Sequence, residues 1–222
     1  IFAGTPPLES LKILVLLALR TIEGKMKQAN NIMVIDIKRA HFYAKALRRV
    51  FIQLPPEDPR YGEEGLCGEL MMSMYGTQDA AANWEAEYSR VLSKAGFVKG
   101  TASPCHFYHA ERRLYVVVHG DDFVATGQEV DLAYLRKTLE GAYECKVEII
   151  GPGDKDQKSV RVLGRMITYR DDGGVEYKPD PGHAEIIVNE LGLNDCNAVA
   201  SPWSQDDDQP DRAETLRRRT GG

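Results

Sequence analysis

The sequence LYVVVHGDDFVATG, residues 114–127, places two adjacent carboxylates between two apolar runs. The branched and aromatic residues on both sides predict two β-strands. Gly120 followed by Asp121 is typical of a tight hairpin, because glycine readily adopts the positive φ of a type II′ turn. We therefore expect Asp121 and Asp122 at the tip of a β-hairpin.

Further elements flank this hairpin on both sides. The stretch NIMVIDI is an apolar run interrupted by Asp36 near its end, which is typical of a strand buried on both faces. Apolar side chains then recur at helical spacing through Trp84 and Tyr88. The predicted order is a strand at residues 31–37, a helix from about residue 80 to Gly96, the hairpin, a helix at 129–143 and a strand at 146–150.

This order of elements predicts the fold class. Strand, helix, hairpin, helix, strand is the order of the split βαβ unit of ferredoxin-like folds, in which four antiparallel strands carry both helices on one face. We therefore expect an α+β fold of this type. In such a sheet the first strand and the hairpin, the first and third elements, are neighbours, so Asp36 and Asp121 are expected to converge.

Converging carboxylates raise one another's pKa values unless cations neutralise them, so a divalent metal is the natural partner. Mg²⁺ prefers carboxylate oxygens, and two such ions can promote phosphoryl transfer. Because neighbouring residues of a strand point to opposite faces, Asp121 is expected to be the stronger ligand, with Asp122 ligating partially or bracing the turn. The alternative is a solvated turn, which is the usual place of an isolated Asp-Asp pair.

The rest of the chain predicts less regular structure. Residues 38–79 are expected to form an irregular subdomain with one strand at 50–54. The other predicted elements are an N-terminal helix from Pro6, capped by Thr5, to Gly24, a second hairpin from residues 160–170 and 175–178, and a helix at 181–191.

Charge and cysteine content limit the functional class. The net charge of −5 argues against a free-standing nucleic-acid binder, so any basic groove must be local. The densest cluster of basic residues is formed by Lys45, Arg48 and Arg49. A nucleic-acid contact and a solvated loop face are about equally expected for this cluster. Four widely spaced cysteines without a C-x-x-C pair predict an intracellular protein, cytoplasmic or nuclear rather than secreted. The most apolar stretch, residues 11–19, is too short to span a membrane, so no membrane association is expected.

Several segments of the chain also match, in the same order, sequence motifs that occur together in one protein family. DIKRAHF and VFIQLPPED resemble D-V-K-T-A-F and V-Y-M-x-Q-P-P. SMYGTQDAAANW resembles S-L-Y-G-L-K-Q-A-P-R-A-W, and AGFVKGTASPCHFY resembles L-G-F-x-x-S-x-x-D-P-C-L-F. LYVVVHGDDFVATG resembles the Y-V-D-D motif, VRVLGRMITYR resembles F-L-G-I-E-I, and CNAVASPW resembles C-x-P-V-x-T-P. Over residues 7–203 the chain thus resembles the reverse transcriptase of copia-type retrotransposons, part of a Pol polyprotein.

The resemblance implies an RNA-directed DNA polymerase, a nucleotidyltransferase that uses two Mg²⁺ ions, with Mn²⁺ as an alternative. Asp36, Asp121 and Asp122 match its catalytic, metal-binding aspartates. The implied nucleotide-binding residues are Ile37, Lys38, His41, Phe42 and Asp79, with either His41 or Phe42 as the gate against a ribose 2′-hydroxyl. The implied partners are an RNA or DNA template with its primer, deoxynucleoside triphosphates, and the integrase and ribonuclease H of the same polyprotein.

The resemblance also implies a division of the chain. Residues 1–202 match the reverse transcriptase domain, with partial fingers and the palm at about 1–150 and the junction of palm and thumb at about 151–202. Residues 203–222 predict a disordered tail. The family's basic fingers segment, K-A-R-L-V-A-x-G, and its ribonuclease H carboxylates are absent. We therefore expect the chain to be truncated at both ends.

Departures from the family pattern leave alternatives open. His119 and Gly120 replace Tyr and Val or Met, Asp79 replaces Gln, and Ala81 and Ala82 replace Pro and Arg, which predicts a weaker nucleotide pocket. The chain could thus be an active polymerase, or a non-catalytic remnant that at most binds nucleic acid or a partner protein. A nucleotide cyclase on the same fold is a third class, against which the segments outside the hairpin argue.

Overall fold

The computed structural model describes residues 3–7, 9–19, 30–194 and 196. The chain divides into two compact units, Ile1–Asp180 and Pro181–Gly222. The predicted helix end at Gly24 and the predicted tail at residues 203–222 lie outside the described residues. The division into fingers, palm and thumb junction stays a prediction.

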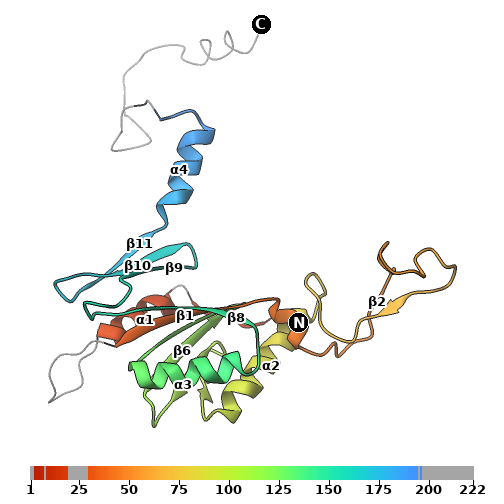
Figure 1. Cartoon of the computed structure of the whole chain (residues 1–222), viewed down its shortest axis with the longest axis horizontal. Helices are drawn as coiled ribbons and strands as arrows, with labels where there is room; N and C mark the ends of the chain where they lie inside the picture. The colour runs from red at the N-terminus through yellow and green to blue at the C-terminus, as the bar shows by residue number, and fades with distance from the viewer. Residues whose placement is uncertain (1–2, 8, 20–29, 195, 197–222) are drawn as a thin grey trace, which may run out of the picture. The chain divides into compact units, whose positions relative to one another are not determined.

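A six-stranded antiparallel sheet forms the centre of the first unit (Figure 1). Its strand order is β4-β5-β6-β7-β1-β8. The strands are β1 (Asn31–Ile37), β4 (Val98–Lys99), β5 (His106–His109), β6 (Leu114–His119), β7 (Asp122–Gly127) and β8 (Cys145–Ile150). Strand β1 lies between β7 and β8, so the expected pairing of the Asp36 strand with the hairpin is confirmed.

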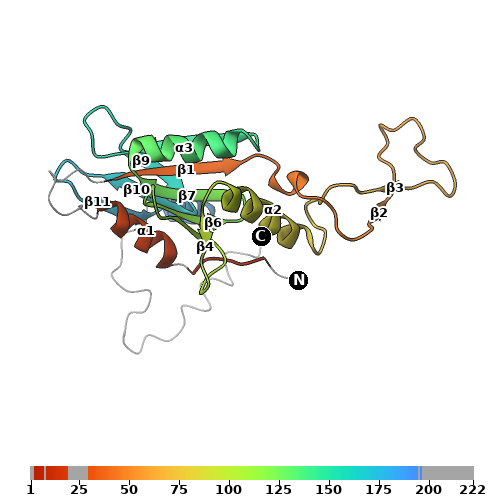
Figure 2. The same cartoon turned by 90° about the horizontal axis from the view of Figure 1, so that it is seen from below.

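Two helices, α2 (Ala80–Lys94) and α3 (Glu129–Glu140), cover one face of this sheet (Figure 2). Their apolar stripes bury Trp84 and Leu135 against alternate residues of the strands, such as Phe123. Successive side chains of a strand point to opposite faces of the sheet. Every second side chain of β1 therefore lies in this core, and the intervening ones lie on the opposite face. The predicted order of elements, strand, helix, hairpin, helix and strand, is present.

The opposite face carries a second core. Helix α1 (Glu9–Leu19) and a small sheet pack there, with the order β11-β10-β9. The strands are β9 (Ser159–Val162), β10 (Arg165–Tyr169) and β11 (Val175–Pro179). The two helices expected on one face are α2 and α3, and α1 covers the other face.

Two sequence predictions are wrong in detail. Pro6 lies outside helix α1, whose bounds are Glu9–Leu19, because Pro7 disfavours a helical conformation of the residue before it. The strand predicted at residues 160–170 is divided into β9 and β10, because Leu163 and Gly164 form a tight turn with φ of 50° and 66°. Positive φ at both central residues is the pattern of a type I′ hairpin turn.

Residues 38–79 are irregular, as predicted. They contain the short 3₁₀ helix η1 (Ala40–Tyr43) and a two-stranded ribbon of β2 (Phe51–Ile52) and β3 (Gly68–Glu69). This ribbon belongs to an arm, the segment between Ala44 and Ser73. The arm extends away from the main sheet in both views (Figures 1 and 2). Hydrogen bonds between the two ends of the arm, such as Ser73 N–H to the carbonyl of Ala44 (2.7 Å), close its base.

The second unit contains the helix α4 (Pro181–Glu190), which confirms the helix predicted at residues 181–191. It is followed by Gly192 with a φ of 65°, a left-handed conformation that ends helices. Among the described residues, no helix is both long and apolar enough to cross a membrane.

Candidate active site at the hairpin tip

The turn between β6 and β7 consists of Gly120 and Asp121, since His119 pairs with Asp122 across the hairpin. Gly120 has a φ of 62°, whereas Asp121 is not among the residues with positive φ. This combination fits the predicted type II′ turn, in which the first central residue alone needs a positive φ. The expected position of the two carboxylates at the hairpin tip is therefore confirmed.

Asp36 stands directly opposite Asp122 in the pairing of β1 with β7. Alternation puts both side chains on the face that carries Val34 and Val124. Asp36 is exposed and Asp122 is half-buried. Burial raises the pKa of Asp122 above its ordinary value, and the charges of Asp36 and Asp121 raise it further. Like charges directly opposite each other destabilise a sheet, so this end of the sheet favours a cation.

The pairing refines the sequence prediction. The sequence predicts that Asp36 and Asp121 converge, and the strand pairing shows that Asp122 is the residue directly opposite Asp36. The reason is that Asp121 belongs to the turn, where strand alternation does not apply. Which of the two is the stronger metal ligand stays a prediction.

The carboxylate of Asp121 is held by a residue that sequence reasoning missed. The hydroxyl of Tyr75 donates a hydrogen bond to Asp121 Oδ2 at 3.0 Å. Burial is the main cause that raises the pKa of Tyr75, and the hydrogen bond to Asp121 raises it further. Tyr75 lies in the SMYGTQDAAANW segment, but a single loop tyrosine has no periodicity that would reveal its partner.

The backbone of the turn is anchored from two directions. The Ile37 N–H donates to the carbonyl oxygen of Asp121 at 3.0 Å. The indole N–H of the buried Trp84 donates to the carbonyl oxygen of Gly120, also at 3.0 Å. These contacts tie the hairpin tip to the end of β1 and to α2.

The predicted nucleotide-binding residues near β1 have different surroundings. The side chain of Ile37 is buried in the core, so only its backbone is available to a ligand. Lys38 Nζ forms an ion pair with Glu144 at 2.8 Å, and Arg39 reaches the other oxygen of the same carboxylate at 3.0 Å. The hydrogen bond from Lys38 is the main cause that lowers the pKa of Glu144. Glu144 therefore pairs with Lys38, the cation expected to meet a triphosphate, and also with its neighbour Arg39.

His41 and Phe42 both lie against Tyr75. The ring centroids of His41 and Tyr75 are 4.2 Å apart, and those of Phe42 and Tyr75 are 5.8 Å apart. Phe42 is 43% exposed, whereas Nδ1 of His41 is buried without a hydrogen-bond partner in the described structure. The candidate gate residues and the hydrogen-bond donor to Asp121 thus form one aromatic group, in which Phe42 is the more accessible ring.

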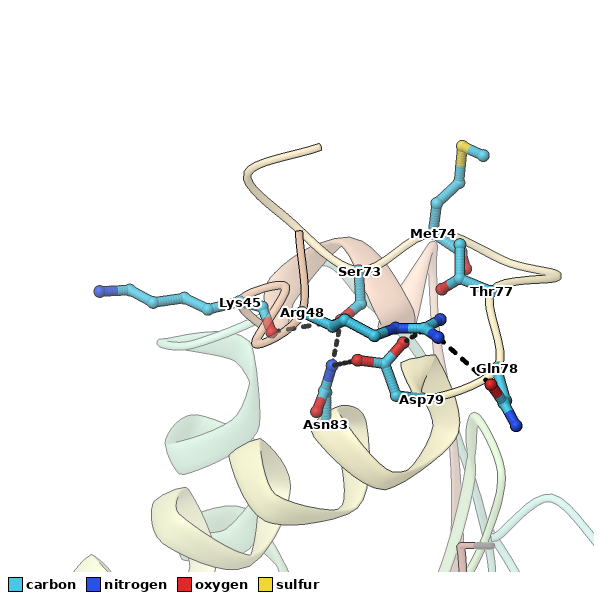
Figure 3. Close-up of polar contacts among 8 residues, drawn as sticks. All are labelled: Lys45, Arg48, Ser73, Met74, Thr77, Gln78, Asp79 and Asn83. Atoms are coloured by element: carbon cyan, nitrogen blue, oxygen red, sulfur yellow. Dashed lines mark hydrogen bonds and ion pairs between the residues drawn. The ribbon is translucent and has the colours of Figure 1, made fainter. Parts of the chain in front are cut away.

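Asp79 has its polar contacts on a separate network at the start of α2 (Figure 3). Its buried carboxylate accepts a hydrogen bond from the Asn83 amide at 3.2 Å and lies 3.5 Å from the Arg48 guanidinium. Asn83 also donates to the hydroxyl of Ser73 at 3.0 Å. The contacts found for Asp79 are therefore structural, and its predicted role in nucleotide binding stays a prediction.

The donor set matches the chemistry of Mg²⁺ or Mn²⁺, because three carboxylates offer the hard oxygen ligands that these ions prefer. The Asp36–Asp122 pair and Asp121 in the adjacent turn supply the negative charge. Among the described residues, however, no group of three or more His, Cys, Asp or Glu side chains is already arranged to hold a metal ion.

Comparisons with known proteins agree with the sequence resemblance. The model of a family described as reverse transcriptase (RNA-dependent DNA polymerase) matches residues 1–205. The chain is also 17% identical over 172 residues to the retrovirus-related Pol polyprotein from transposon TNT 1-94 of Nicotiana tabacum. This match covers 76% of the chain and 12% of the length of that polyprotein.

Proposed function

Because this chain belongs to the reverse transcriptase (RNA-dependent DNA polymerase) family, we propose that it is the polymerase palm of a copia-type retrotransposon. In this proposal it extends a primer 3′-hydroxyl with deoxynucleotides along an RNA or DNA template. The observation that carries the proposal is the meeting of Asp36 and Asp122 on the adjacent strands β1 and β7, with Asp121 in the turn that precedes β7.

The strand order supports the palm assignment. The order β8-β1-β7-β6 within the six-stranded sheet is that of a split βαβ unit, with α2 and α3 on one face. In this arrangement the ends of β1 and β7 bring two carboxylates together without any loop rearrangement. We propose that β4 and β5 extend the palm sheet and that the arm around β2 and β3 belongs to the fingers.

The proposed chemistry assigns roles to the residues at the tip. When bound, divalent cations would supply charge neutralisation and activation of the primer hydroxyl. Asp36, Asp121 and Asp122 would hold them, and the anchors from Ile37 and Trp84 would keep the turn in place. Phe42 is the better candidate for the sugar gate, because its ring is exposed beside the turn while His41 is largely covered.

One observation favours the second candidate, a remnant that binds nucleic acid without catalysis. Lys38 and Arg39 are paired with Glu144, and Arg48 is paired with Asp79. Cations that could contact phosphate are therefore partly neutralised by the protein itself.

Primer extension separates the two candidates. The full chain is incubated with a primed homopolymer template, deoxynucleotides and Mg²⁺ or Mn²⁺, and the Asp36→Asn and Asp121→Asn variants are compared with it. The matched control is Asp171→Asn, since Asp171 is an exposed carboxylate in the turn between β10 and β11. Incorporation that is lost in the first two variants and kept in the third supports the polymerase. Absence of metal-dependent incorporation, together with salt-sensitive binding of primer–template that Asp36→Asn leaves unchanged, would support the remnant.

A further inference from the structure

Tyr75 makes the one polar side-chain contact found for the Asp121 carboxylate in the described part of the chain. Its hydroxyl donates to Oδ2 at 3.0 Å, while Oδ1 has no such partner there. Asp121 therefore has one oxygen fixed by the protein and one oxygen available to a ligand.

The position of the Tyr75 hydroxyl is determined by its neighbours. The His41 ring lies 4.2 Å from the Tyr75 ring with an interplanar angle of 38°, and the Phe42 ring contacts it edge-on at 5.8 Å. Both neighbours belong to η1, which is separated by two residues from the β1 strand that carries Asp36. Because two rings restrict the tyrosine, little side-chain freedom is lost when its hydroxyl binds the carboxylate.

The backbone contacts show why this side-chain contact matters. Ile37 and Trp84 fix the carbonyl groups of the turn, but neither contact sets the rotation of the Asp121 side chain. In proteins, ligating carboxylates are oriented by hydrogen bonds from surrounding residues, and loss of such a partner typically weakens metal binding about 10- to 100-fold. Tyr75 is the residue placed to do this for Asp121.

We propose that Tyr75 is a positioning residue, which holds Oδ2 of Asp121 and leaves Oδ1 as the oxygen that binds a divalent cation at the hairpin tip. This inference rests on the proposed function, since it assigns a task toward the metal site of the polymerase. Tyr75 is 43% exposed, so we expect an effect at the lower end of the usual range, about 10-fold in metal affinity.

The test is a Mn²⁺ titration of the full chain, in which electron paramagnetic resonance measures the free ion. Tyr75→Phe removes only the hydroxyl and keeps the ring contacts with His41 and Phe42. The matched control is Tyr61→Phe, because Tyr61 is 48% exposed on the arm. Asp121→Asn is included as a direct test of the metal site. We expect Tyr75→Phe to weaken Mn²⁺ binding about 10-fold, Tyr61→Phe to leave it unchanged, and Asp121→Asn to weaken it at least as much as Tyr75→Phe.

The outcomes distinguish this inference from the proposed function. Equal or tighter Mn²⁺ binding by Tyr75→Phe, with weaker binding by Asp121→Asn, overturns the role of Tyr75 and leaves the metal site standing. No Mn²⁺ binding by any form, or binding that Asp121→Asn does not change, overturns both. A second measurement separates positioning from misfolding: in primer extension, a partly unfolded variant lowers the maximal rate, whereas a mispositioned ligand raises the Mn²⁺ concentration needed for half the maximal rate. An unchanged half-saturating concentration in Tyr75→Phe would again overturn the inference.

Discussion

Replacement of Gly120 by alanine tests whether the turn that presents the carboxylates has the conformation described. Gly120 has a φ of 62°, and a Cβ added there would meet no heavy atom within 4 Å. The cost of Gly120→Ala is therefore backbone strain alone, about 1–2 kcal/mol for a left-handed residue. A loss of unfolded-state entropy offsets about 0.4–1 kcal/mol of this. We expect a net loss of about 1 kcal/mol in the free energy of unfolding.

Urea unfolding followed by circular dichroism measures this loss. With a slope of about 2 kcal/mol per molar urea, the midpoint should fall by about 0.5 M. The matched control is Gly141→Ala after α3, where φ is −73° and alanine is unstrained. Its added methyl group would lie 3.2 Å from the carbonyl oxygen of Lys137, a contact that a small shift relieves. A midpoint for Gly120→Ala that equals or exceeds that of the unchanged protein would refute the left-handed turn.

Three further predictions concern the surroundings of the site. Asp122 has a raised pKa in the folded state, so the fold loses stability as pH rises from the ordinary carboxyl pKa through the folded value. Asp122→Asn should therefore raise the melting temperature at pH 7 but not at pH 3, and a gain of the same size at both values would contradict this cause. Glu144→Gln should free Lys38 and strengthen binding to primer–template at low salt, as measured by fluorescence anisotropy. The same gain in the control Glu140→Gln would show that only net charge matters. Asp79→Ala should cost about 1–3 kcal/mol in urea unfolding, because it removes a hydrogen-bond acceptor from the buried Asn83 amide. A change in the KM for deoxynucleotides without loss of stability would instead support nucleotide binding by Asp79.

The secondary structure of the central sheet could be read from the sequence because its signals are local. The apolar runs around Asp36 and Asp121, the helical spacing through Trp84 and the Gly-Asp turn each depend on neighbouring residues alone. The Leu163-Gly164 turn has no such local signal, so the sequence did not predict it. Leucine in a left-handed conformation has no local preference for it, and pairing of β9 with β10 is what imposes the turn.

The sequence by itself determined the order of elements, the placement of Asp121 and Asp122 at a hairpin tip, and the resemblance to reverse transcriptases. The tertiary structure decided which groups these carboxylates meet. It placed Asp122 rather than Asp121 opposite Asp36, and it brought Tyr75 to Asp121 across 46 residues of chain. The physical reason is that periodicity and turn chemistry act over a few residues, whereas strand register and side-chain hydrogen bonds between distant segments depend on how the whole sheet packs.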